Sequence, residues 1–178
     1  MNREYEDKEA NHVVRRLFYF FLFIGIIPLL IIFILYLNNP QSQFLNIMAA
    51  SAVNIPTWFS TESPLLSKLM GVYCKTALVA GLLWFIFSIK WLRPNKAIDK
   101  NLILKTNFFY VIFYGVFIFL SCFSRSELAT SGKLLRFMTI NDYILACFYI
   151  SLYVVIFVFT CIFLAIPYIS IKSLTGRH

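Results

Sequence analysis

The most regular feature of the chain is a set of long apolar runs separated by polar segments. Residues 17–61 carry no formal charge, and residues 17–37 are nearly all Leu, Ile, Phe or Tyr. An α-helix needs about 20 apolar residues to cross the hydrocarbon core of a bilayer. Residues 17–37 are therefore predicted to form a membrane-spanning helix. The sequence Asn38-Asn39-Pro40 ends it, because Pro cannot continue a helix and Asn favours a turn.

Three further apolar runs predict three further spans. Residues 38–68 carry many polar residues and two prolines after Pro40, so they are predicted to form a loop outside the membrane. The next uncharged run, residues 76–89, has only 14 residues, about 21 Å of helix. This span must therefore begin earlier, near Leu69, with Lys75 inside it. The predicted spans are residues 17–37, 69–89, 106–124 and 143–171, and the last is long enough to cross with tilt to spare.

Composition agrees with this pattern. Apolar types make up 60% of the 178 residues and charged types 13%, whereas soluble domains carry about 25% charged residues. The predicted fold class is an all-α integral membrane protein, with residues 1–178 forming a single four-helix transmembrane domain. An ordinary water-soluble globule is excluded.

The distribution of Lys and Arg predicts the orientation in the membrane. Eleven of the 16 basic residues lie in the N-terminal tail, in loop 90–105 or at the C-terminus, and five lie on the opposite side. Basic residues accumulate in cytoplasmic segments, so both termini and loop 90–105 are predicted to be cytoplasmic. Loops 38–68 and 125–142 are predicted to be periplasmic. The same bias accounts for the net charge of +8, so no nucleic-acid partner is needed to explain it.

Residues that usually carry chemistry are absent from the predicted spans. The two histidines, His12 and His178, lie in the tails, and all eight carboxylates lie outside the four apolar runs. Neither a histidine-based metal site nor a catalytic pair is available, so no enzyme activity, cofactor or metal is expected. A proton- or cation-coupled carrier would also lack its membrane carboxylate.

The second span carries two features that suggest a contact surface. Lys75 is the one charge inside a predicted span. Its long stem either carries the ammonium to the outer interface or holds it against a partner. Ala77 and Gly81 lie four residues apart and form a small-residue face that allows another helix to approach closely.

The loop 125–142 is rich in polar residues of both charge signs. It is interpreted either as a solvated turn, in which Asn141 or Asp142 caps the fourth helix, or as a recognition loop. Its polar members are Glu127, Thr130, Ser131, Gly132, Lys133, Arg136, Asn141 and Asp142.

Three stretches of the chain resemble the immunity proteins for colicin A-type pore-forming bacteriocins. They are Ile24-Gly25-Ile26-Ile27-Pro28-Leu29, Met70-Gly71-Val72-Tyr73-Cys74-Lys75-Thr76-Ala77 and Glu127-Leu128-Ala129-Thr130-Ser131-Gly132-Lys133, the last followed by Leu135, Arg136, Met138, Asn141 and Asp142. Length, span count and paired cytoplasmic termini agree with that family over essentially the whole chain. Leu78 departs from it, because proline is expected there, and Ala129 and Ser131 vary the expected loop sequence.

The resemblance implies a bacteriocin immunity protein in the bacterial inner membrane, lying in the lipid bilayer. Such a protein binds the pore-forming domain of its cognate colicin and prevents the channel from opening, without catalysing a reaction. We expect the partner-binding residues to be Tyr73, Lys75, Thr76, Ala77 and Gly81 on the second span, and Glu127, Thr130, Gly132, Lys133, Arg136, Asn141 and Asp142 in the loop. Without the resemblance, the composition also allows a small membrane carrier or an assembly subunit of a membrane complex.

Overall fold

The computed structural model describes residues 3–93, 100–128, 130, 132 and 133–174, and in these ranges the chain is all-helical, with seven helices and no strand. The helices are α1 (Arg3–Asn38), α2 (Gln43–Ser51), α3 (Pro64–Cys74), α4 (Thr76–Ser88), α5 (Lys100–Phe123), α6 (Lys133–Thr139) and α7 (Asp142–Leu174). Part of the predicted loop 90–105 lies outside the described residues, as do Ala129 and Ser131.

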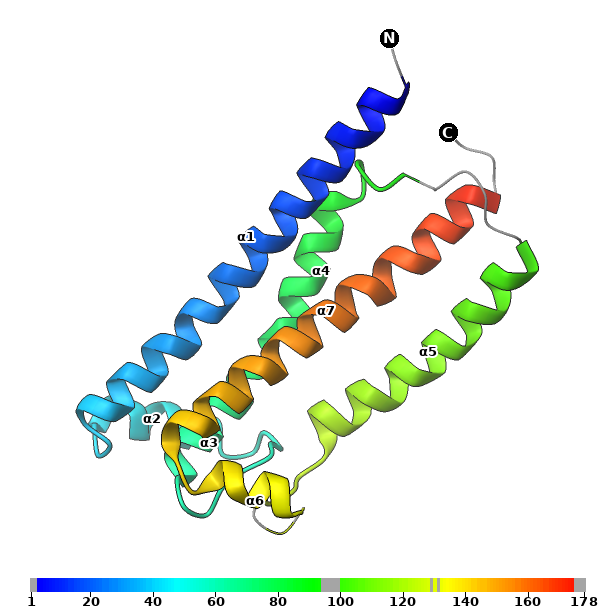
Figure 1. Ribbon diagram of the computed structural model, residues 1–178. Coiled ribbons are helices and arrows are strands. Elements are labelled where there is room, and N and C mark those ends of the chain that lie inside the picture. The colour runs from blue at the N-terminus through cyan, green and yellow to red at the C-terminus, as the bar shows by residue number, and fades with distance from the viewer. Residues whose placement is uncertain (1–2, 94–99, 129, 131, 175–178) are drawn as a thin grey trace.

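The long helices run side by side between two ends of a bundle (Figure 1). The start of α1, the end of α4, the start of α5 and the end of α7 lie at one end, called here the termini end. The short helices α2 and α6 lie at the opposite end, called here the α6 end, together with the start of α3. Hydrogen bonds agree with this arrangement: Lys172 Nζ donates to the carbonyl of Leu92 at 3.1 Å at the termini end.

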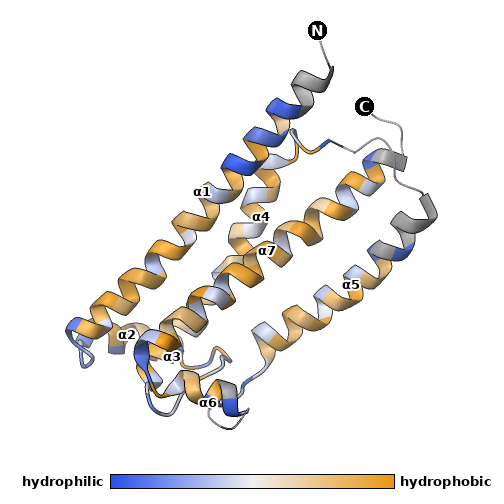
Figure 2. Ribbon diagram, in the orientation of Figure 1, coloured by the Kyte–Doolittle hydropathy of each residue, from blue (hydrophilic) through white to orange (hydrophobic). Residues whose placement is uncertain are grey.

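Helix α7 is the centre of the bundle, since it packs against α1, α3, α4, α5 and α6. Its side chains Tyr149, Tyr153 and Phe157 are fully buried. Helix α5 packs mainly on α7 and leaves a row of large apolar side chains exposed, among them Phe109 and Phe119. Figure 2 shows that the long helices are apolar along most of their length, which suits a bundle whose outside faces lipid rather than water.

Three helical segments are long and apolar enough to cross a membrane: Lys8–Asn38, Pro64–Ser88 and Asp142–Lys172. They correspond to the first, second and fourth predicted spans. The third predicted span is a helix, but within its described residues the apolar stretch is the shorter Asn107–Ser121.

The second span differs from its prediction in where it begins. Its helix starts at Pro64, five residues before the expected Leu69, because Pro fits the first turn of a helix, where no N–H partner is available. The helix is interrupted at Lys75, whose N–H donates to the carbonyl of Val72 and whose carbonyl accepts from Leu78 N–H, each at 3.2 Å. These contacts over three residues form a tight turn that separates α3 from α4.

Two short helices form inside segments that were expected to be loops. Helix α2 lies within residues 38–68 and α6 within residues 125–142. Leu45 of α2 is completely buried, so packing against the bundle accounts for a helix that nine residues alone would not hold.

Several polar side chains inside the bundle form hydrogen bonds within the chain. The Tyr114 and Thr160 hydroxyls lie 3.0 Å apart and join α5 to α7. Thr160 also donates to the carbonyl of Ile156 at 2.7 Å, and Trp84 Nε1 donates to the carbonyl of Val14 at 3.4 Å. Such pairs satisfy groups that would otherwise lie unpaired in hydrocarbon.

Candidate partner-binding site

Two connecting segments are tied together at the α6 end. Phe59 N–H donates to the carbonyl of Ser126 at 3.1 Å, and Leu128 N–H donates to the carbonyl of Phe59 at 2.9 Å, which forms an isolated parallel bridge between Phe59 and Glu127. Leu128, whose N–H forms one of these bonds, is itself buried. The loop that follows α5 is therefore held against the segment that precedes α3.

Glu127 and Thr130 take part in this connection. Thr61 Oγ1 donates to Glu127 Oε1 at 2.9 Å, and Thr130 Oγ1 donates to the Glu127 carbonyl at 3.0 Å. Glu127 is half-buried and Thr130 is exposed. Both therefore shape the loop, and Thr130 remains open to contact from outside.

Asn141 and Asp142 begin α7. The Asn141 Oδ1 accepts a hydrogen bond from Tyr143 N–H at 2.8 Å, which confirms that Asn141 caps this helix, one of the two roles proposed for it from the sequence. The Ser63 hydroxyl donates to the Asp142 carboxylate and links the starts of α3 and α7.

Gly132, Lys133 and Arg136 form or begin α6. Gly132 has a φ of +149°, a value that residues with a side chain rarely adopt, so glycine is required for the turn into the helix. Lys133 and Arg136 are exposed, and so are the large apolar Phe137 and Ile140, at 61% and 73%. Sequence reasoning missed these two residues, and their position beside the cations in an otherwise polar loop was the available signal.

Tyr73, Lys75 and Thr76 lie at the junction of α3 and α4. The Tyr73 ring stacks on that of Tyr153, with centroids 5.8 Å apart and planes 18° apart. Thr76 is exposed and its hydroxyl donates to the carbonyl of Tyr73 at 2.7 Å. Lys75 is half-buried and follows Pro64, the first residue of α3, by eleven residues, about 16 Å of helix.

Ala77 and Gly81 face the inside of the bundle. Ala77 has no exposed surface. A Cβ placed on Gly81 would lie 2.7 Å from Thr160 Cγ2 and 2.8 Å from Thr160 Cβ. The small-residue face therefore brings α4 close to the chain's own α7.

The twelve predicted residues fall into two groups. The seven residues from Glu127 to Asp142 gather at the α6 end, on or beside α6. The five from Tyr73 to Gly81 lie on one helical segment that runs from the α3–α4 junction toward the termini end. Among the described residues, no three His, Cys, Asp or Glu side chains come together as a metal site.

Comparisons with known proteins agree with the resemblance. The family model for colicin immunity proteins matches residues 41–178. The chain is 36% identical over 173 residues to the Colicin-A immunity protein of Citrobacter freundii, covering 97% of this chain and 95% of the relative. It is 32% identical over 172 residues to the Colicin-B immunity protein of Escherichia coli, covering 97% and 98%. No solved structure matches the chain. With a family model covering most of its length and two relatives matched nearly end to end, the chain belongs to the colicin immunity protein family.

Proposed function

We propose that this protein protects a colicin-producing bacterium by binding the pore-forming domain of a colicin in the inner membrane and keeping its channel closed. Membership of the family supports bacteriocin immunity, and the relatives named for colicins A and B support a colicin as the partner. Immunity of this kind needs a binding surface and no catalysed reaction. The cognate colicin is bound without a cofactor.

The bundle would cross the membrane four times with both termini in the cytoplasm. In support, nine basic residues of the described ranges lie toward the termini end, namely Arg3, Lys8, Arg15, Arg16, Lys90, Arg93, Lys100, Lys105 and Lys172. Five lie on the other half of the bundle, the excess that the positive-inside rule associates with the cytoplasmic side. The full α5 has 24 residues, about 36 Å of helix, which is long enough to cross the membrane as the third predicted span.

The observation that carries the binding site is the composition of the exposed surface at the α6 end. Lys133 and Arg136 stand beside exposed Phe137 and Ile140, so the surface combines charge with large apolar side chains. In the proposed orientation this end faces the periplasm, from which the toxin arrives. Arg and aromatic side chains such as Phe are enriched at protein–protein interfaces.

Contacts deeper in the membrane would add to this surface through the exposed or half-buried Tyr73, Lys75 and Thr76. Association between helices in lipid depends on packing and hydrogen bonds worth roughly 0.6–2 kcal/mol each, so several are needed. Binding prevents opening only if the closed channel is bound more tightly than the open one. Ala77 and Gly81 would act indirectly, by packing α4 on α7 and so fixing the position of Lys75 and Thr76.

The experiment that tests the function is a toxin challenge. The chain is expressed in sensitive cells, which are then exposed to individual pore-forming colicins, with osmotic shock used to bypass the outer-membrane receptor. We expect protection against at least one colicin A-type pore domain. Protection against none of them would overturn the proposed function.

The site is tested with variants compared at equal abundance in the membrane. The exposed surface is changed by the triple variant Lys133→Ala, Arg136→Ala, Phe137→Ala, and the deeper contacts by Lys75→Ala. The control is Lys105→Ala with Phe109→Ala, which removes one exposed cation and one exposed Phe from α5, away from this surface. Protection should fall for the first two variants and not for the control. Full protection by both would refute the proposed surface and leave the immunity function standing.

The loop connection is tested by Glu127→Ala. This change removes the carboxylate that accepts from Thr61 and should weaken protection by loosening the loop. Glu127→Gln retains an acceptor oxygen and serves as its control. Equal protection by both variants would show that the contact between Glu127 and Thr61 is not needed.

A further inference from the structure

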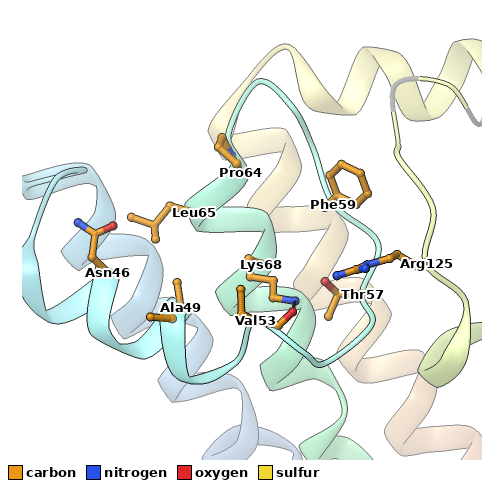
Figure 3. Close-up of a pocket in the computed structure, with 10 residues that line it drawn as sticks. Asn46, Ala49, Val53, Thr57, Phe59, Pro64, Leu65, Lys68 and Arg125 are labelled. Atoms are coloured by element: carbon orange, nitrogen blue, oxygen red, sulfur yellow. Dashed lines mark hydrogen bonds between the residues drawn. The ribbon is translucent and has the colours of Figure 1, made fainter.

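A hollow of about 720 Å³ lies at the α6 end, bounded by α2, the segment that follows it, and α3 (Figure 3). Val53 lines it from the turn that follows α2, and α2 itself lines it with Asn46, Ala49 and Ala50. These positions recur at the spacing of one helix face. The volume falls within the range of roughly 300–1,000 Å³ that is typical of small-ligand sites.

Two cations line this hollow without a carboxylate to balance them. Lys68 comes from α3 and Arg125 from the segment after α5, and none of the ten lining residues is acidic. Figure 3 shows the Arg125 side chain extending toward Thr57 and Lys68. The hollow therefore attracts an anion, and a guanidinium beside an ammonium is a common arrangement for phosphate.

Both cations retain donors for a ligand. Lys68 Nζ donates to the carbonyls of Val53 at 3.2 Å and Ile55 at 2.6 Å, which fixes its position and leaves the third ammonium proton available. Arg125 is exposed and forms no hydrogen bond or ion pair within the described part of the chain. The Lys68 ammonium is thus held in place, while the guanidinium can adjust to an occupant.

The depth of the hollow indicates the kind of anion. Helix α2 begins five residues after α1 ends at Asn38, so it lies at the level where the first span leaves the membrane. Its other face exposes Phe44, Ile47 and Met48, and α2 has no charged residue. Its exposed apolar face fits the boundary between headgroups and acyl chains, where phospholipid phosphates also lie.

We propose that this hollow binds one anionic phospholipid of the outer leaflet, with its phosphate between Lys68 and Arg125 and its apolar portion along Ala49, Ala50 and Val53. A phospholipid has a negative charge to pair with the two cations and acyl chains to cover the apolar side of the hollow. Free phosphate would leave that apolar side exposed. Lipid is also the most concentrated phosphate at this depth. The inference goes beyond the immunity function and rests on the proposed membrane location and orientation, not on binding of a colicin.

The test is native mass spectrometry of the full-length protein released from nanodiscs that contain phosphatidylcholine with or without phosphatidylglycerol. We expect one retained phosphatidylglycerol, preferred over phosphatidylcholine by at least tenfold. The double variant Lys68→Gln, Arg125→Gln should lose this preference. The double variant Lys133→Gln, Arg136→Gln removes the same charge from exposed sites on α6 and should keep it.

Lys68 also donates to the carbonyls of Val53 and Ile55, so its replacement could disturb the local fold. A second variant therefore tests the site without changing Lys68. Ala50→Phe fills the hollow without changing any charge, and should exclude the lipid while the helical circular dichroism remains that of the wild type. Retention of phosphatidylglycerol by both this variant and the Lys68/Arg125 variant would overturn the proposal. Displacement of the lipid by millimolar inorganic phosphate would instead assign the hollow to free phosphate. If lipid retention were unchanged in the Lys68/Arg125 variant but toxin protection were lost, the hollow would belong to the colicin.

Discussion

The packing of α4 on α7 at Gly81 gives the sharpest test of the structure. A Cβ at this position would lie 2.8 Å from the Thr160 Cβ, and rotation about χ1 cannot move that atom. Carbon atoms pack best at about 3.5–4.0 Å, so Gly81→Ala forces the two helices apart by roughly 0.7 Å. Overpacking of this kind costs about 1–3 kcal/mol.

Gly115 on α5 supplies a matched control, because a Cβ built there has no neighbour within 4 Å. Replacing Gly by Ala in a helix interior is worth about 0.5–1 kcal/mol through backbone entropy, and this gain applies to both variants. The difference between Gly81→Ala and Gly115→Ala therefore isolates the packing cost. We expect Gly81→Ala to be the less stable of the two by about 1–3 kcal/mol.

The measurement is unfolding by sodium dodecyl sulfate in mixed micelles, followed by far-ultraviolet circular dichroism. Thr160→Ser removes the Cγ2 that would lie 2.7 Å from the new methyl group and keeps the hydroxyl bonded to Tyr114 and Ile156. In the Gly81→Ala background it should recover part of the loss, so that the two changes are not additive. Equal stability of Gly81→Ala and Gly115→Ala would contradict the close approach of α4 to α7.

Two further predictions use the same unfolding measurement. Leu78→Pro should cost only about 0.5–1.5 kcal/mol, because position 78 lies in the first turn of α4 and proline there removes a single hydrogen bond, from Leu78 N–H to the carbonyl of Lys75. Leu82→Pro in the helix interior should cost about 3 kcal/mol or more. Similar losses for both would contradict the helix break that precedes α4. Tyr149→Phe should cost about 1–3 kcal/mol, because its hydroxyl donates at 2.7 Å to the carbonyl of Trp58, which would be left without that partner. Tyr143→Phe, at a side chain that is 60% exposed, should stay within about 0.5 kcal/mol of the wild type, and an equal loss at both tyrosines would argue against that bond.

The long helices were predictable because their signal is local. Apolar runs located the end of α1 and the start of α7 to within one residue of Asn38 and Asp142. The start of α3 was missed by five residues, because residues 38–68, which include Ser67 and Lys68, were assigned to a loop for their polar residues and prolines. Both residues are in fact bonded within the chain, Ser67 Oγ by donating to the carbonyl of Pro64 at 3.2 Å and Lys68 to two carbonyls.

The local sequence pattern did not predict the short helices, nor which helix each helix face packs against. Helix α2 depends on burying Leu45, a tertiary contact that no local pattern reveals. The small-residue face of Ala77 and Gly81 correctly indicated a close helix approach, but a sequence does not say which helix approaches. A cap at Asn141 or Asp142 was predictable because capping is a local contact. The N–H that Asn141 Oδ1 binds belongs to Tyr143, only two residues further along the chain.

Polar side chains inside the bundle and those at the α6 end differ in how far they can change. This difference indicates which residues would set the toxin specificity of a family member. Within the bundle, polar side chains such as Tyr114, Thr160 and Trp84 bond to groups of the same chain. Changing them would disturb the fold before it changed a partner. The exposed charges of α6 carry no such constraint, since surface substitutions usually shift stability by about 0.5 kcal/mol or less. Exchanging residues 132–141 with the corresponding segment of a relative should therefore alter which colicin is resisted while the bundle stays folded, and an exchange that unfolds it would contradict this division.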